Sequence, residues 1–138
     1  MHLTLHHVNL ASDVTSEMHA FYTSVLGLTP APELEDRRIG DLVTTDNKFV
    51  HDGKIQVHLS DRDAGLLFRS GHAVNPIDHG HVGFETDDIE AVKQQLREQE
   101  VPFADYGQWA MAGWYQIFFH DPAGNVVEVF QAMGADRP

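Results

Sequence analysis

The stretch LHHVNLASD at residues 5–13 alternates between polar and apolar side chains, the pattern of a strand with one buried face. The stretch HVGFET at residues 81–86 has the same character, with His81 in the place that His7 takes in the first. Both stretches are followed by an acidic residue and then by apolar residues at helical spacing. The sequence therefore predicts one strand–helix–strands unit that is used twice, with pseudo-twofold symmetry.

Each unit is predicted to contain one helix with an apolar face. The first helix begins after Asp13, the expected N-cap, and ends near Gly27. The second begins at Asp87, which together with Glu90 resembles a capping box. The apolar faces consist of Met18, Phe21, Tyr22, Val25 and Leu26 in the first helix, and of Ile89, Val92 and Leu96 in the second.

Further strands are predicted in both units. Each unit ends in a strand, at residues 54–60 and 125–131, and the triplet VHL at 57–59 corresponds to VEV at 127–129. Residues 114–120 form another strongly β-prone run. Between these landmarks, residues 29–53 are expected to hold two short strands with loops, around Ile39, Leu42, Val43, Phe49 and Val50.

Strand alternation brings four ionisable side chains toward one face of the predicted sheet, because successive side chains point to opposite faces. His7 shares its face with Asn9, whereas the neighbouring His6 is expected to point to the other side. The same alternation gives the candidate set His7, His58, His81 and Glu128.

These four residue types suggest a divalent metal site. Imidazole nitrogen and carboxylate oxygen suit Zn, Ni, Fe, Mn or Co. Two His and one carboxylate also leave coordination positions open, which is typical of catalytic sites. We therefore predict His7, His81 and Glu128 as metal ligands; His58 is a fourth ligand, a proton-transfer group or a substrate contact. The alternative is a set of unrelated polar residues on a solvated sheet face.

Composition narrows the function classes. The chain has 138 residues, for which one domain over 1–138 is expected, and its 9 Lys and Arg against 21 Asp and Glu give a net charge of −12. This acidity disfavours nucleic acids and anionic membrane surfaces as partners. Without cysteine, disulfides and thiol nucleophiles are excluded. With no apolar run long enough to span a bilayer and no signal-peptide pattern, a cytoplasmic protein is expected.

Three segments together resemble a known family. They are residues 7–28 (HVNL through FYTSVLGL), residues 80–89 (GHVGF followed by DDI) and residues 119–129 (FHDPAGNVVEV). In combination they are similar to the glyoxalase I, bleomycin-resistance and extradiol-dioxygenase family, also called the vicinal oxygen chelate superfamily.

The resemblance implies an α+β fold of two βαβββ modules, whose mixed sheets curl around a metal site. Module one would cover about 1–61, a connector about 62–79, and module two about 80–133. His7, His81 and Glu128 take the family's ligand positions, and His58 stands where relatives carry Glu or Gln. The resemblance also implies a homodimer and a small-molecule substrate.

Three functions follow as hypotheses. The first is a metal-dependent lyase or isomerase of the glyoxalase type, in which the ion binds two neighbouring substrate oxygens and Glu128 or His58 is the catalytic base. The second is an extradiol-type Fe(II) dioxygenase, with His58, His120 or Tyr115 as acid–base partner. The third is a protein that sequesters a small molecule in an aromatic cleft, for which the candidates are Tyr106, Trp109, Trp114 and Tyr115.

Overall fold

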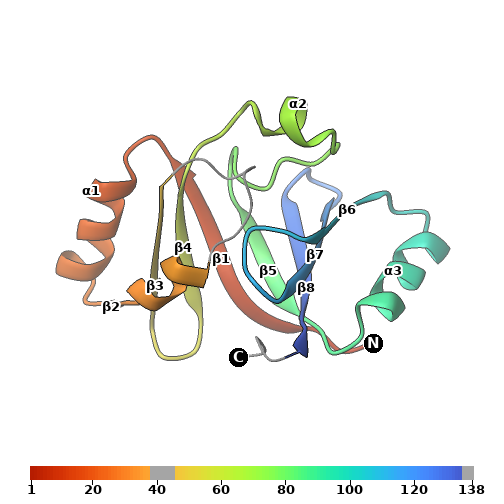
Figure 1. The fold of residues 1–138 in the computed structure, drawn as a ribbon, viewed down its shortest axis with the longest axis horizontal. Helices are drawn as coiled ribbons and strands as arrows, with labels where there is room; N and C mark the ends of the chain where they lie inside the picture. Colours follow the sequence, from red (N-terminus) through yellow and green to blue (C-terminus); the bar gives the residue numbers. More distant parts are fainter. Residues whose placement is uncertain (38–45, 135–138) are drawn as a thin grey trace.

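A computed structural model of the chain describes residues 1–37 and 46–134. These residues form one mixed sheet of eight strands in the order β2-β3-β4-β1-β5-β8-β7-β6 (Figure 1). The strands are β1 (Thr4–Ser12), β2 (Thr29–Pro30), β3 (Asn47–His51), β4 (Gln56–Asp61), β5 (His81–Glu85), β6 (Phe103–Gln108), β7 (Trp114–His120) and β8 (Val126–Ala132). The helical segments are α1 (Thr15–Ala20), η1 (Phe21–Val25), η2 (Pro32–Arg37), α2 (Leu66–Ser70) and α3 (Ile89–Glu98).

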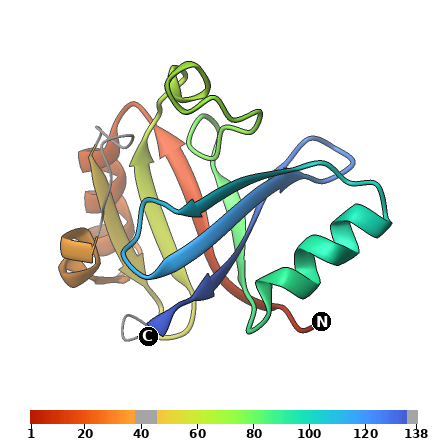
Figure 2. The ribbon, with the colours of Figure 1, turned by 45° about the vertical axis from the view of Figure 1, so that its right-hand side comes forward.

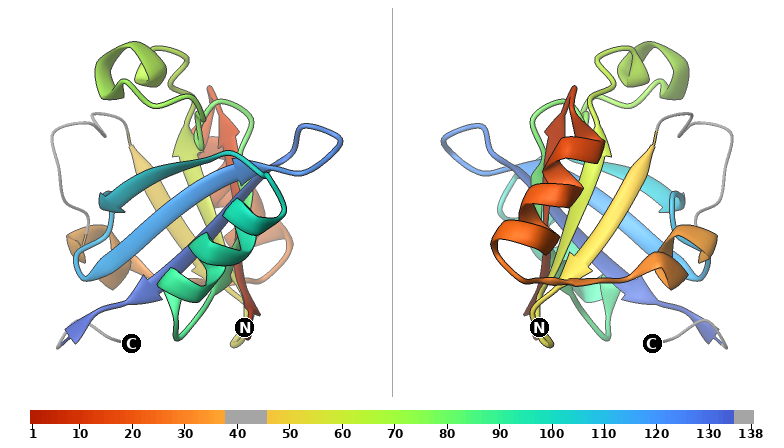
Figure 3. Two further views of the ribbon diagram at one scale, coloured as in Figure 1. Left: turned by 90° about the vertical axis from the view of Figure 1, so that its right-hand side faces the viewer. Right: turned by 90° about the vertical axis from the view of Figure 1, so that its left-hand side faces the viewer.

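The sheet curls strongly without closing, and α1 and α3 lie on its outer side (Figures 2 and 3). Helix α1 packs on β3 and β4, and α3 packs on β8. The expected α+β fold with a curled mixed sheet is therefore confirmed. None of the helices in the described part of the chain is long and apolar enough to cross a membrane.

The two halves follow the same plan down to the pairing of individual residues. Strands β1 and β5 lie antiparallel at the centre, where His7 pairs with Gly83 and Asn9 pairs with His81. Each then pairs in parallel with the closing strand of its own half, so that Asn9 lies opposite His58 and Gly83 lies opposite Glu128. His58 and Glu128 are thus equivalent positions under the predicted pseudo-twofold symmetry.

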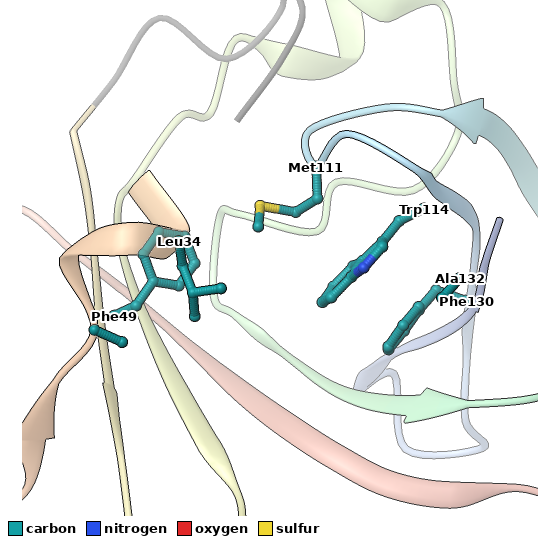
Figure 4. Packing of buried hydrophobic residues seen from close by; sticks show 7 residues of the cluster. Leu34, Phe49, Met111, Trp114, Phe130 and Ala132 are labelled. Atoms are coloured by element: carbon teal, nitrogen blue, oxygen red, sulfur yellow. The ribbon is translucent and has the colours of Figure 1, made fainter. Parts of the chain in front are cut away.

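A hydrophobic cluster spans the inside of the curled sheet and joins the halves. Leu34 and Phe49 come from the first half, whereas Met111, Trp114 and Phe130 come from the second (Figure 4). The rings of Trp114 and Phe130 stack with centroids 3.8 Å apart. Ala31 and Ala132 complete this cluster. Burial of these apolar side chains stabilises the packing of the first half of the sheet against the second.

The prediction for the first helix is wrong in its packing. After α1 the chain winds as the π-helical segment η1, whose wider turn changes the direction of the following side chains. Phe21, Val25 and Leu26 consequently lie 48%, 68% and 54% exposed instead of covering the sheet. Gly27 ends the helical segment with a positive φ, as predicted. Asp13 is not the N-cap, because the carbonyl of Val14 begins the helix.

The second helix packs as predicted, but its cap is displaced by one residue. Ile89 and Val92 are buried against β7 and β8. The N-cap is Asp88, whose carboxylate accepts a hydrogen bond from the backbone N–H of Ala91 at 3.0 Å. Glu90 does not complete a capping box, because its carboxylate accepts from Lys93.

Replacing Asp88 by alanine should lower the free energy of unfolding by about 1 kcal/mol, because it removes the acceptor that caps α3. Urea unfolding measures this effect. The matched control is Asp87→Ala, which removes an adjacent carboxylate that does not cap the helix and should change stability much less. Equal losses in the two variants would contradict the assignment of Asp88 as the cap.

Two regions were only partly anticipated. The two short strands expected within residues 29–53 are β2 and β3. Ile39, Leu42 and Val43, which belonged to the same expectation, lie outside the described residues. Strand β6 was not predicted, since residues 103–108 alternate weakly and are followed by a glycine-flanked loop.

Candidate metal centre

Three side chains converge at the centre of the curled sheet from strands β1, β5 and β8. The Nε2 atoms of His7 and His81 lie 3.3 Å apart. Oε1 of Glu128 lies 3.3 Å from Nε2 of His7 and 3.0 Å from Nε2 of His81. All three side chains are almost completely buried. The three predicted ligands thus present one atom each to a common point.

Hydrogen bonds on the far side of each group fix the atom that faces this point. Nδ1 of His81 donates to the backbone carbonyl of Pro76 at 2.7 Å, which leaves the lone pair on Nε2. Gln116 donates from Nε2 to the other carboxylate oxygen of Glu128, at 3.4 Å. Such outer contacts orient metal ligands in known sites.

Strand alternation predicted that His6 points away from His7, and this prediction is wrong. A bulge in the pairing of β1 with β5 falls between Leu5 and His7. His6 therefore packs edge-on against Trp114 and Phe130, and its Nδ1 lies 2.9 Å from Nδ1 of His7. Burial, followed by the nearby His7, lowers the pKa of His6 to about 4, so its imidazole is neutral at pH 7.

The charge state of the centre follows from burial and from its neighbours. Burial alone would raise the pKa of Glu128, but His7 and His81 outweigh it and hold that pKa far below its usual range. Burial lowers the pKa of His7 by more than Glu128 raises it. The centre therefore combines an ionised carboxylate with a neutral His7 at pH 7.

This arrangement fits a divalent cation. Ligand atoms about 2.1 Å from an ion, at angles typical of tetrahedral or octahedral coordination, are separated from one another by about 3.0–3.4 Å. The three observed separations, 3.0, 3.3 and 3.3 Å, fall within that range. A cation bound between these buried groups would also compensate the charge of the Glu128 carboxylate.

Gly83 makes room for this arrangement, and the sequence analysis missed it. Gly83 lies opposite His7 in the β1–β5 pair. A Cβ atom at this position would overlap the imidazole ring of His7. The backbone of β5 at Gly83 therefore forms one wall of the space that His7 occupies.

His58 lies beside the three converging groups without presenting its Nε2 to them. Its ring stacks on His7 with centroids 4.1 Å apart, and its Nε2 lies 2.7 Å from Oε1 of Gln56. Burial, followed by the neighbouring His7, lowers the pKa of His58 well below its usual range, so the imidazole is neutral.

A cavity of about 50 Å³ adjoins the centre and is lined by His58, His81 and Glu128. Among residues 1–37 and 46–134, four buried side-chain polar atoms have no hydrogen-bond partner. They are Oδ1 of Asn9, Oε1 of Gln116, and the Nε1 atoms of Trp109 and Trp114, and all four residues line this cavity. Unpaired buried polar atoms are uncommon in proteins, so these four atoms are candidate contacts for a bound molecule.

The other aromatic candidates occupy different places. Trp109 lines the cavity, and Trp114 lines it while packing on Phe130. Tyr106 does not line the cavity but packs behind Trp109, and its hydroxyl donates a hydrogen bond to the carbonyl of Val74. His120 is exposed and lines a larger groove of about 720 Å³, to which β1 contributes residues 8–10 and β5 contributes His81 and Val82.

Tyr115 belongs to an ion-pair cluster on the outer face of the sheet. Nζ of Lys93 donates to Tyr115 at 2.6 Å and lies 2.8 Å from the carboxylate of Asp105, to which Tyr115 also donates. Burial alone would raise the pKa of Asp105, but hydrogen bonds from Lys93 and Tyr115 outweigh it and lower that pKa. These contacts give Tyr115 a structural role, in which it links Lys93 of α3 to Asp105 of β6.

Replacing Asp105 by asparagine should lower the free energy of unfolding at pH 7 by about 0.5–1 kcal/mol, because the carboxylate is 39% exposed and partly screened. The unfolded chain protonates Asp105 at a higher pH than the folded protein does, so the difference from wild type should vanish as pH falls below 3.8. Urea unfolding over a pH series measures this. Glu90→Gln, which alters a more exposed partner of Lys93, is the control; a difference that does not change with pH would contradict the assignment.

Comparisons with known proteins identify the family of this chain. Residues 4–129 match the family described as the Glyoxalase/Bleomycin resistance protein/Dioxygenase superfamily. A curated relative, "Glyoxylase I 4" of Arabidopsis thaliana, is 26% identical over 134 residues, which cover 94% of this chain and 71% of that protein.

Solved structures show the same fold. Methylmalonyl-CoA epimerase from Mycobacterium tuberculosis superimposes with a TM-score of 0.69 at 19% identity, covering 94% of this chain and 88% of that one. A hypothetical protein from Bacillus halodurans C-125 gives a TM-score of 0.65 at 15% identity, covering 97% of each chain. With a family match over almost its whole length, the chain belongs to the Glyoxalase/Bleomycin resistance protein/Dioxygenase superfamily.

Proposed function

We propose that the protein is a divalent-metal-dependent enzyme of the glyoxalase type, a lyase or isomerase that moves a proton on a small substrate. The observation that carries this proposal is the convergence of Nε2 of His7, Nε2 of His81 and Oε1 of Glu128 beside a buried cavity. A divalent ion held by these residues would supply Lewis-acid chemistry to two neighbouring oxygens of the substrate.

His58 is the proposed catalytic base. It lines the cavity and is neutral, so it can accept a proton. Because Oε1 of Gln56 can only accept, Nε2 of His58 carries the hydrogen and Nδ1 holds the lone pair. His58 takes the proton from the substrate carbon at Nδ1 and returns it to the carbon that is protonated in the product. Glu128, which is ionised and has two His beside it, contributes mainly as a ligand.

The cavity disfavours sequestration of a large molecule, and of the three acid–base candidates for ring cleavage only His58 lines it. Its volume of about 50 Å³ is far below the 300–1,000 Å³ of pockets that hold drug-sized ligands, which disfavours sequestration of a large molecule there. Two acid–base candidates for ring cleavage, Tyr115 and His120, lie away from the cavity. Proton transfer on a small substrate needs neither of them.

The proposal includes a homodimer. Superfamily members often form dimers. The exposed apolar side chains of Phe21, Val25 and Leu26 would be covered in such an assembly. A sedimentation experiment that shows only monomers at micromolar concentrations would contradict this part of the proposal.

The test is proton exchange on a small hydroxycarbonyl compound. The purified protein, stripped with EDTA and reloaded with Zn, Ni, Co, Mn or Fe(II), is incubated with hydroxyacetone in D₂O, and deuterium incorporation next to the carbonyl is followed by NMR. His58→Gln should retain bound metal but slow the exchange by about 10²–10⁴-fold. His79→Gln, a change at an exposed imidazole, is the control. If no metal accelerates exchange over the stripped protein, this function is excluded.

A further inference from the structure

Two amide side chains that line the cavity beside the metal centre carry unpaired acceptor atoms. Nδ2 of Asn9 donates to Oγ of Ser60 at 2.8 Å, and that hydroxyl donates to Asn47 at 2.6 Å. The amide of Gln116 is oriented in the same way, since its Nε2 donates to Glu128. With both NH₂ groups engaged, the atoms left without a partner are the two oxygens, Oδ1 of Asn9 and Oε1 of Gln116.

Two indole side chains contribute donors to the same cavity. Trp109 comes from the loop between β6 and β7, and Trp114 begins β7 and is fixed by its stack on Phe130 (Figure 4). An indole N–H can only donate, and both Nε1 atoms are buried without an acceptor. The cavity wall therefore presents two donors and two acceptors that the described residues do not satisfy.

The size and charge of the cavity restrict what can satisfy these atoms. A volume of about 50 Å³ has room for about three to five waters, and hence for a compound with few non-hydrogen atoms. Neither Lys nor Arg occurs among the described residues that line it. In the metal-free protein an anion would therefore meet no cationic Lys or Arg side chain among these residues.

We infer that Asn9, Trp109, Trp114 and Gln116 form a recognition subsite for a small, uncharged ligand that both donates and accepts hydrogen bonds. A hydroxycarbonyl compound has this chemistry: its oxygens accept from the indole N–H groups and its hydroxyl donates to an amide oxygen. An apolar ligand would leave all four protein atoms unpaired, which is unfavourable in a buried site. That this ligand is the substrate rests on the proposed function, but its binding to the subsite does not require the metal.

The two tryptophans allow a direct test, because they are the only two in the sequence. In a ¹H–¹⁵N spectrum of the full-length, EDTA-treated protein, both indole N–H signals report on the subsite. Hydroxyacetone should shift both signals in a saturable manner. Butanone, which has the same number of non-hydrogen atoms but no hydroxyl, and pyruvate, which is anionic, should bind about tenfold more weakly or worse.

A single variant assigns the signals and tests one donor. Trp109→Phe keeps a ring at this position but removes its N–H, and it leaves one indole signal, that of Trp114. Hydroxyacetone should still shift this signal, with a Kd raised about five- to tenfold. Phe68→Leu, at an exposed apolar residue away from the cavity, is the matched control and should leave the Kd unchanged.

The outcomes separate this inference from the proposed function. Indole signals that hydroxyacetone does not move, or butanone or pyruvate binding as tightly as hydroxyacetone, would overturn the inferred subsite, whatever the metal-loaded protein does. Saturable shifts in the metal-free protein with the expected ligand preference would support it, even if the proton-exchange experiment finds no activity.

Discussion

Replacing Glu128 by glutamine should abolish tight divalent-metal binding. Glutamine keeps the shape of the side chain but removes the charged oxygen that lies 3.0 Å from Nε2 of His81 and 3.3 Å from Nε2 of His7. Changes to residues that only hydrogen-bond to metal ligands weaken metal binding by up to about 100-fold. Loss of one of the three ligands themselves should therefore weaken binding by at least about 100-fold.

Metal content by mass spectrometry and thermal unfolding with and without added Zn²⁺ measure this prediction together. Added metal should raise the unfolding temperature of wild type, since it binds only the folded state, and should leave Glu128→Gln unchanged. His79→Ala, in which a mostly exposed imidazole two residues before His81 is removed, should behave as wild type. If added Zn²⁺ instead raises the unfolding temperature of Glu128→Gln as much as that of wild type, the three residues form a structural network and not a metal site.

Replacing Gly83 by alanine should disrupt the same centre without altering any ligand. The added methyl group would overlap the imidazole of His7, which is completely buried and cannot move aside freely. We expect metal affinity to fall by about 10–100-fold and the free energy of unfolding to fall by about 1–3 kcal/mol.

The matched control is Gly65→Ala, because a methyl group there meets mainly the flexible end of Arg69 and the backbone φ is negative. Metal titration and urea unfolding of both variants measure the effect. Wild-type metal affinity in Gly83→Ala would show that the position of the His7 ring does not determine binding.

The part of the fold that alternation and duplication determine was predictable from the sequence. A strand places every second side chain on one face, so His7, His81 and Glu128 could be assigned to one face from spacing alone. The sequence predicts that His58 and Glu128 occupy equivalent positions. In the structure His58 pairs with Asn9, and Glu128 pairs in the same way with Gly83.

The errors arise where the backbone departs from regular geometry. A bulge before His7 turns His6 toward the interior, and strand periodicity cannot reveal a bulge. The π-helical turn after α1 exposes Phe21 and Val25, although their spacing fits an ordinary helix. Gly83 matters because it faces the ring of His7 on the neighbouring strand. The sequence alone does not show which residue a glycine faces across a sheet.

The cavity could not be predicted from the sequence, for a different reason. Its wall combines Asn9 from β1, Trp109 from a loop and Gln116 from β7, which only the curl of the sheet brings together. Trp109 was a candidate because of its glycine-flanked loop, whereas Asn9 and Gln116 carried no distinguishing pattern.

The antiparallel junction of β1 with β5 has a consequence for the duplicated architecture. One imidazole belongs to the first copy, while the second copy supplies the other imidazole and the carboxylate. The second copy alone holds two of the three groups and the first copy one, so the complete ligand set exists only where β1 meets β5. A bound cation would link the two copies, and amide hydrogen exchange along β1 and β5 should slow when the ion is present.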